Sequence, residues 1–169
     1  NSQNILDKIY KHEIDIGVIA KPYLKSFKSD IFSLPYLKQK IIIIVGKNHK
    51  LSNKNTISIK ELNGLNLINR EKGSETRRVF EESLLENNVK VNTIMEVTRT
   101  TMIRAVYENM GIGIISEPEF YDFKELKKLY ISDVEVFTQA YVVCLKNKKN
   151  SNLIKAFLET TKKYTNYFA

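Results

Sequence analysis

Cysteine, histidine, proline and glycine are scarce in this sequence, and tryptophan is absent. A single cysteine, Cys144, excludes an internal disulfide and any site built from several thiolates. It lies in the stretch Tyr-Val-Val-Cys-Leu at residues 141–145, which is typical of a buried strand and favours a structural thiol over a nucleophile. The two histidines, His12 and His49, lie in lysine-rich polar stretches and fit surface positions better than metal ligation. We therefore expect no metal and no cofactor.

Long hydrophobic runs are also missing. The longest, from Ile41 to Val45, is far too short to cross a membrane. The first residues, Asn-Ser-Gln-Asn, include no basic region followed by an apolar stretch, so we expect no signal peptide. They also lack an initiating methionine, so we expect the chain to be a fragment. The scarcity of cysteine fits a reducing compartment, and we expect a cytoplasmic protein without a membrane partner.

Positive charge is in excess but dispersed. The chain has 27 Lys and Arg against 19 Asp and Glu, a formal net charge of +8. The lysines are mixed with Asn, Ser and Glu, which indicates a solvated surface rather than a nucleic-acid groove, and neither an RNA-binding aromatic motif nor a zinc-finger spacing is present. With 43% hydrophobic and 27% charged residues, the composition is that of an ordinary globular protein.

Hydrophobic periodicity predicts alternating helices and strands. Helices are expected at residues 2–11, 58–62, 75–87, 98–110 and 152–164, with a short helix or turn at 118–128. Strands are expected at residues 14–20, 31–36, 40–46, 66–69, 91–97, 111–116, 129–131, 134–138 and 141–146, with Pro35 ending the second. This alternation predicts an α/β fold with a mostly parallel sheet.

Three hydroxyl-rich turns directly precede predicted helices. They are Asn1–Gln3, Gly73–Thr76 and Thr98–Thr101. A helix start offers unpaired backbone N–H groups and a partial positive charge, and in α/β folds such turns lie at the carboxyl ends of strands, where ligands bind. Ser and Thr are also the commonest helix caps, so plain capping explains any single one of these turns better than ligand contact does.

Arginines flank the middle turn. Arg70, Arg77 and Arg78 surround Gly73 and Ser74, and a guanidinium can hold an anion through two parallel hydrogen bonds. The neighbouring acids Glu71 and Glu75 could equally pair with these arginines on the surface. The sequence leaves both interpretations open.

Enzyme motifs are absent. No phosphate loop or nucleophile elbow is present, and Gly111-Ile112-Gly113 lacks the third glycine of a dinucleotide fingerprint and precedes a strand. The acidic pairs Glu81–Glu82 and Glu117/Glu119 fit solvated surfaces. We therefore expect a binding protein and not an enzyme.

Five segments, in order along the chain, carry a family resemblance. They are Asn1–Gln3 before a helix, Ile-Asp-Ile-Gly-Val-Ile-Ala at 14–20, the apolar strand and His49 within 41–51, Ser-Ile-Lys-Glu-Leu at 58–62, and residues 105–116 with Gly-Ile-Gly-Ile-Ile-Ser. Together they resemble the effector-binding domain of LysR-type transcriptional regulators, with Lys50 in place of the family's usual proline. Residues 70–78, 115–120 and 141–145 are further similar to a subgroup associated with aminoethylphosphonate catabolism.

The resemblance implies a fold and a domain organisation. The fold is that of type 2 periplasmic binding proteins, α/β with two lobes joined by two crossover strands. Residues 1–40 and 146–169 would form lobe one and residues 41–145 lobe two, with the effector in the cleft that they share. The family's winged helix-turn-helix and the first strand-helix unit of the sensing domain have no counterpart here, so the resemblance implies an N-terminally truncated domain.

The resemblance also implies site residues and partners. Carried over residue by residue, the effector contacts are Ser2, Ala20 and Lys21 in lobe one and Gly73, Ser74, Thr76, Arg77, Thr100 and Thr101 in lobe two. The effector would be a small anion such as a phosphonate, phosphate or carboxylate. We expect a homodimer or homotetramer that reaches DNA only through the missing winged helix-turn-helix. The alternative is a solute-binding protein of a transport system with the same fold.

Overall fold

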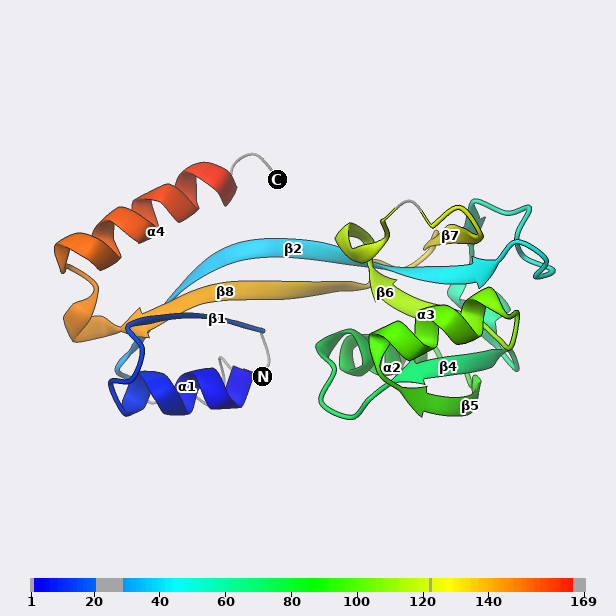
Figure 1. Ribbon diagram of the computed structural model, residues 1–169, viewed down its shortest axis with the longest axis horizontal. Helices are drawn as coiled ribbons and strands as arrows, with labels where there is room; N and C mark the ends of the chain where they lie inside the picture. Colours follow the sequence, from blue (N-terminus) through cyan, green and yellow to red (C-terminus); the bar gives the residue numbers. More distant parts are fainter. Residues whose placement is uncertain (1, 21–28, 122, 166–169) are drawn as a thin grey trace. The chain divides into compact units, whose positions relative to one another are not determined.

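The fold was derived from a computed structural model, which describes residues 2–20, 29–121 and 123–165. The α-helices are α1 (Ser2–Tyr10), α2 (Glu75–Glu86), α3 (Arg99–Tyr107) and α4 (Asn152–Thr165), and short 3-10 helices lie at Ile59–Leu62, Glu117–Glu119 and Lys146–Lys148 (Figure 1). The strands are β1 (Ile16–Ala20), β2 (Ile31–Gly46), β3 (Thr56–Ile57), β4 (Asn66–Arg70), β5 (Asn92–Val97), β6 (Gly113–Ser116), β7 (Leu126–Ile131) and β8 (Phe137–Leu145).

The chain forms two compact units. Unit 1 comprises Asn1–Lys38 and Gln139–Ala169, and unit 2 comprises Gln39–Thr138. The chain passes between the units twice, once inside β2 and once inside β8, so both connections are strands. The second passage lies near the start of β8, and residues 140–144 of that strand pair with β1 in unit 1.

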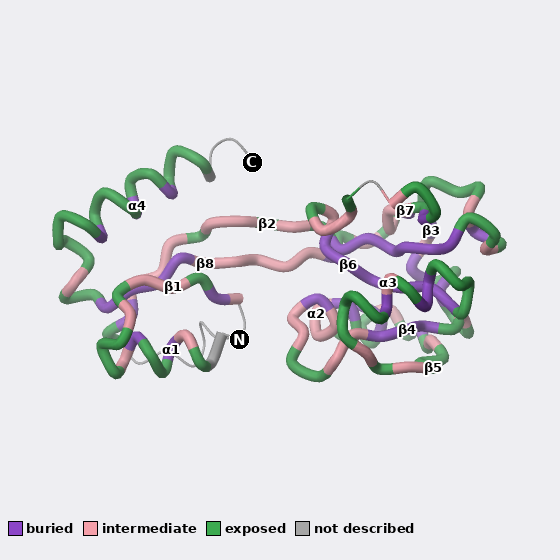
Figure 2. The backbone as a smooth tube through the Cα atoms, viewed as in Figure 1, coloured by how far each residue is buried: buried purple, intermediate pink, exposed green. Residues whose placement is uncertain are grey.

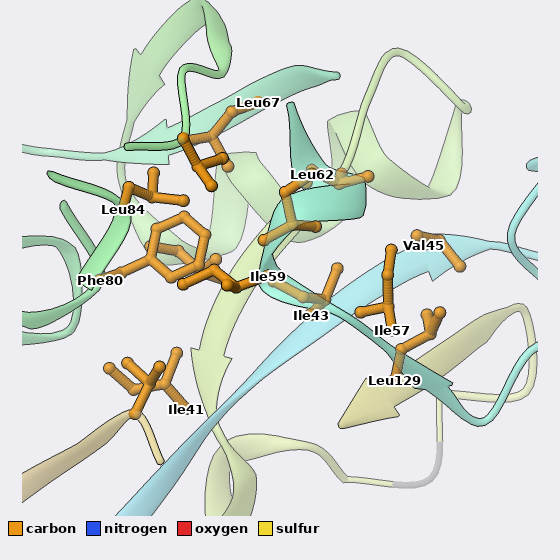
Figure 3. Close-up of a cluster of buried hydrophobic side chains, with 14 of the residues drawn as sticks. Ile41, Ile43, Val45, Ile57, Ile59, Leu62, Leu67, Phe80, Leu84 and Leu129 are labelled. Atoms are coloured by element: carbon orange, nitrogen blue, oxygen red, sulfur yellow. The ribbon is translucent and has the colours of Figure 1, made fainter. Parts of the chain in front are cut away.

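The isoleucine run of β2 is the centre of unit 2. Ile41, Ile43 and Val45 point to one side of the strand, where they pack with Phe80 and Leu84 of α2 (Figure 3). Ile42 and Ile44 point to the other side and pack with α3, whose contributions are Met102, Ala105 and Val106. The run is apolar at every position because both faces of the strand are covered, as its near-continuous hydrophobicity predicts.

Unit 1 repeats this arrangement on a smaller scale. Strand β1 pairs antiparallel with β8, with Gly17 opposite Val143. Val143 and Leu145 of β8 join Leu6 and Ile9 of α1 in one cluster. The alternate residues Val142 and Cys144 join Ile154 and Leu158 of α4 in another, and β8 is accordingly buried at this end (Figure 2). Cys144 is fully buried, and burial raises the pKa of its thiol above the ordinary value.

Three helices end in the same way. The residues that follow them, His12, Asn88 and Asn109, have positive φ angles of 58°, 55° and 57°. In each case the next amide reaches back to a carbonyl five residues earlier, as in the bond from Met110 N to Ala105 O of 3.1 Å. Asn and His tolerate this left-handed conformation better than most side chains, which explains polar residues at these ends.

Three expectations about the strands were wrong. Strand β2 runs from residue 31 to 46 without stopping at Pro35, which is exposed and whose fixed φ suits extended backbone. Residues 134–138 and 141–146 do not form two strands, since one strand, β8, covers residues 137–145. The sheets are mixed rather than mostly parallel: β1/β8, β2/β6 and β2/β7 are antiparallel, while β3/β7 and β4/β5 are parallel. Among the described residues, no helix is both long and apolar enough to span a membrane.

Candidate functional site

Three strands of unit 2 end at one edge. Strands β4 and β5 are parallel, with Arg70 opposite Val97 at their carboxyl ends, and Glu71 N donates to Val97 O at 3.0 Å. Ile112, directly before β6, forms a parallel bridge with Leu67 of β4, and Ile112 N donates to Asn66 O at 2.8 Å. The structure thus brings together the segments that follow Arg70, Val97 and Ser116, which is where open α/β folds bind ligands.

Two of these segments begin helices. Ser74 precedes α2, and its Oγ accepts from Arg77 N at 3.4 Å, so it caps the helix as its sequence context predicts. Gly73 before it has a φ of +90°, and no described atom beyond Gly73 and its two chain neighbours lies within 4 Å of where a Cβ would stand. Ser74 is half-buried and Thr76 is buried. The open space at Gly73 leaves room for a ligand to approach the backbone closely.

The start of α3 presents accessible hydroxyls. Thr98 has the extended conformation of an N-cap residue but makes no capping bond with its side chain. Its Oγ1 lies 3.1 Å from Thr101 Oγ1, and both Thr100 and Thr101 are exposed. The first amides of a helix have no acceptor within the helix, so this turn offers both hydroxyl and N–H donors.

The arginines around the middle turn are engaged with the protein itself. Arg77 donates to Glu81 Oε1 at 2.8 Å, to Arg70 O at 2.9 Å and to Glu96 Oε1 at 2.9 Å, and its side chain is only 14% exposed. The hydrogen bond with Glu96 leads the interactions that raise the pKa of Arg77. Arg77 therefore ties α2 to the ends of β4 and β5.

The other two arginines also pair with carboxylates. Arg70 Nη2 lies 2.9 Å from Glu71, and Arg78 bonds Glu75 at 2.7 Å and also contacts Glu82. The hydrogen bond from Arg70 leads the causes that lower the pKa of Glu71. Of the two interpretations that the sequence left open, pairing with neighbouring acids is what the structure contains.

Further charged groups line the same edge. Arg99 bonds Glu119 at 2.7 Å, and Lys128 Nζ lies 3.3 Å from Glu117, which also accepts a hydrogen bond from Tyr130 OH. The bond from Tyr130, followed by that from Lys128, lowers the pKa of Glu117. The sequence gives no sign of this cluster, because its members come from α3, β7 and the segment after β6.

Unit 1 contributes fewer observations. Ser2 is the first residue of α1, and Ala20 is the last of β1, half-buried and opposite Ala140. Lys21 lies outside the described residues. The structure places the predicted contacts of unit 2, which are Gly73, Ser74, Thr76, Arg77, Thr100 and Thr101, after the paired ends of β4 and β5, and their contact with a ligand stays a prediction, as does that of Ser2, Ala20 and Lys21.

Within residues 2–20, 29–121 and 123–165, no cluster of three or more His, Cys, Asp or Glu could hold a metal ion. His49 Nδ1 accepts from Leu51 N at 3.3 Å, and it lies in the loop after β2 rather than at the strand-end edge. The strand-end edge of unit 2 instead carries neutral hydrogen-bond donors, the hydroxyls and backbone amides at the starts of α2 and α3, with ion pairs on either side of them.

Comparison with known proteins gives consistent relatives. Residues 1–166 match the family described as the LysR substrate binding domain. The HTH-type transcriptional activator CmpR of Synechocystis is 31% identical over 163 residues, which cover 94% of this chain and 53% of that protein. An uncharacterized regulator of Methanocaldococcus jannaschii is 28% identical over 149 residues, covering 78% of this chain and 50% of its own length. The chain spans about half the length of the curated relatives it matches.

Solved structures agree with the observed fold. The regulatory domain of Synechocystis CcmR in complex with 2-PG has a TM-score of 0.79 and 26% identity, covering 98% of this chain and 80% of that one. The effector binding domain of QuiR with shikimate has a TM-score of 0.80 and 21% identity, covering 98% of this chain and 78% of that one. The named relatives are regulators, so a transport protein is not favoured. The chain belongs to the family of LysR substrate-binding domains.

Proposed function

We propose that the chain is the effector-sensing part of a LysR-type transcriptional regulator and binds a small anion. The observation that carries this proposal is the meeting of three strand ends at one edge of unit 2, where the turns that begin α2 and α3 follow the paired ends of β4 and β5. Backbone amides and hydroxyls at such an edge suit the oxygens of a phosphonate, phosphate or carboxylate.

The relatives support an anionic effector. The CcmR domain was solved with 2-PG and the QuiR domain with shikimate, and both are small polar ligands. We propose the same class for this chain, with a phosphonate as one candidate among the phosphorus-containing and carboxylate anions. The specific link to aminoethylphosphonate rests on the sequence resemblance alone.

We assign roles to the residues of unit 2 as follows. Gly73 admits the ligand to the backbone, and Ser74, Thr100 and Thr101 donate hydrogen bonds to it, with Thr76 supporting the turn from its buried position. Arg77 acts as a positioning residue, because its donors already hold Glu81, Glu96 and Arg70 O. Ser2, Ala20 and Lys21 are assigned as contacts from unit 1 on the resemblance alone.

The proposed mechanism is a shift between conformations. A ligand that binds one conformation more tightly stabilises it, and the shift cannot exceed the difference between its two affinities. The response would reach DNA through a winged helix-turn-helix in a longer cytoplasmic protein, assembled as a homodimer or homotetramer. No catalytic step is part of this function.

Calorimetric titration of the chain tests the proposal. Inorganic phosphate, 2-aminoethylphosphonate, 2-PG and shikimate are compared with a neutral sugar, and we expect saturable binding of at least one anion and none of the sugar. The double substitution Ser74→Ala and Thr101→Val should weaken that binding about tenfold or more, since each lost donor is worth about 1 kcal/mol. Thr93→Val, at an exposed position of β5, is the matched control.

A folded protein that binds none of these anions would count against the proposal. Equal weakening by the control and by the double variant would place the anion away from the helix starts.

A further inference from the structure

A cavity of unit 2 lies along the side of α3. Its volume is about 360 Å³, within the range of small-molecule sites. The apolar part of its wall consists of Ile103, Tyr107, Phe123 and Leu126. Leu126 is buried, and Ile103 and Phe123 pack against the same hydrophobic cluster, so the floor of the cavity is continuous with the core.

The polar part of the wall carries an excess of positive charge. Arg104 pairs with Glu108 at 3.0 Å and lies 5.0 Å from the centre of the Tyr107 ring. Glu125 pairs with Lys47 at 3.3 Å. Lys124 also lines the cavity and forms no ion pair with any residue of the described ranges. Of the charged residues that line the cavity, Arg104 and Lys124 are cations and Glu125 is the carboxylate, which leaves one positive charge in excess beside the apolar wall.

We propose that this cavity binds a small amphipathic monocarboxylate, with an aryl or short alkyl body against the apolar wall and its carboxylate toward Lys124. An apolar body needs the four nonpolar side chains, and a single negative charge matches the single excess cation. A neutral apolar ligand would leave Lys124 unused, and a dianion would exceed the available charge.

The cavity is separate from the edge proposed for the effector. It shares only Thr100 with the residues assigned there, and all of its lining comes from α3 and residues 123–126 of unit 2. Because Thr100 lies at the start of α3, a ligand in the cavity would contact the same helix that bounds the effector edge. The binding itself does not depend on the proposed function.

Three matched probes separate the parts of this proposal. Phenylacetate carries both ring and charge, phenylacetamide carries only the ring, and acetate carries only the charge. We expect phenylacetate to bind saturably, with a dissociation constant on the order of 1 mM, and to shift the amide resonances of residues 100–107 and 123–126 in the ¹⁵N spectrum of the whole chain. Phenylacetamide and acetate should each bind at least threefold more weakly.

Substitutions locate the ligand. Lys124→Gln should weaken phenylacetate about two- to fivefold, as expected for one exposed charge, and should leave phenylacetamide unchanged. Tyr107→Ala removes a wall that is 42% exposed and should weaken both aromatic probes more than fivefold. Lys90→Gln, an exposed lysine outside the cavity, is the control and should change neither.

The outcomes distinguish this proposal from the effector site. No saturable shift up to 10 mM phenylacetate, an estimate of about ten times the expected constant, would overturn it. Equal effects of Lys124→Gln and Lys90→Gln would overturn it too, as would shifts confined to residues 73–76. The double variant Ser74→Ala and Thr101→Val should retain phenylacetate binding, whereas it should lose the anion of the effector edge.

Discussion

At the scale of single residues, Arg77 shows what a sequence pattern leaves undecided. Its place beside Gly73 and Ser74 fits an anion contact as well as an ion pair. In the structure, the guanidinium N–H groups of Arg77 donate hydrogen bonds to Glu81, Glu96 and Arg70 O. Glu81 lies four residues along the same helix and was foreseeable, but Glu96 is on β5 and becomes a neighbour only through the pairing of β4 with β5.

Replacing Arg77 by Lys should destabilise the protein although the charge is kept. Lysine cannot reach three acceptors in the directions that the planar guanidinium serves, so at least one hydrogen bond is lost. We expect the free energy of unfolding in urea to fall by about 1–2 kcal/mol. Arg104→Gln, which breaks the exposed pair with Glu108, is the comparison and should cost less than about 0.5 kcal/mol. Equal losses would show that Arg77 is only a surface charge.

His49 should make stability depend on pH between neutrality and mild acid. Burial, followed by the charge of Lys50, lowers the pKa of His49 below its ordinary value of 6.5, and its neutral Nδ1 accepts from Leu51 N. As pH falls below 6.5, the unfolded chain takes up the proton before the folded one does. The contribution of His49 is therefore complete above that pH and is lost as pH falls through the lower, folded pKa.

The variant His49→Asn isolates this effect. An asparagine side chain can accept the same amide hydrogen and does not titrate. Urea unfolding at pH 7.5 and 5.5 should show a smaller loss of stability in the variant, by less than about 1 kcal/mol. The carboxylates and His12 are common to both proteins, so they cancel in the comparison. Identical losses would indicate that His49 has the same pKa folded and unfolded.

At the scale of elements, the order of helices and strands could be predicted and several boundaries could not. The run Ile41 to Val45 indicates a strand buried on both faces, and α2 and α3 cover it. Pro35 suggests a break, yet β2 continues, because a proline at an exposed position removes no buried hydrogen bond. The mixed sheet was not predictable from alternation, since β2 and β8 belong to both units.

The stability of the protein should depend strongly on which side chain stands at Asn88, the left-handed residue after α2. Asn88 has a φ of 55°, and Val89 N closes the helix by donating to Leu84 O at 2.9 Å. Asn88→Gly should leave stability unchanged or raise it, whereas Asn88→Val should lower the free energy of unfolding by about 1–2 kcal/mol because a β-branched residue is strained there. Thermal melts followed by circular dichroism measure both variants. A valine variant as stable as the glycine variant would contradict the assigned helix end.

At the scale of the whole molecule, the turns of unit 2 that the sequence predicts as ligand contacts lie at one strand-end edge. Hydroxyls before predicted helices are the reason for predicting Ser74, Thr100 and Thr101, and their turns follow the paired ends of β4 and β5. The cavity beside α3 gave no signal, because Tyr107 and Phe123 are ordinary helix and loop residues until the chain brings them together.

Unit 2 should fold without unit 1. Residues 39–138 are one continuous segment, and they contain both hydrophobic clusters that β2 separates. We expect this segment, expressed alone, to unfold cooperatively on heating and to give dispersed amide resonances. The two segments of unit 1, joined by a short glycine-serine linker in place of residues 39–138, serve as the comparison and should be less stable. A disordered spectrum for the 39–138 segment would contradict this prediction.

The division of unit 1 into two parts has a consequence for protein synthesis. Residues 139–169, which supply β8 beyond its first residues and all of α4, leave the ribosome after residues 39–138. Until then α1 and β1 lack the partners that cover Ile9 and Ile19, while residues 39–138 are already complete. Helix α1 and strand β1 therefore expose apolar side chains until the later segment is translated, about 6–26 s for some 130 residues at 5–20 residues per second, which makes them a target for chaperones.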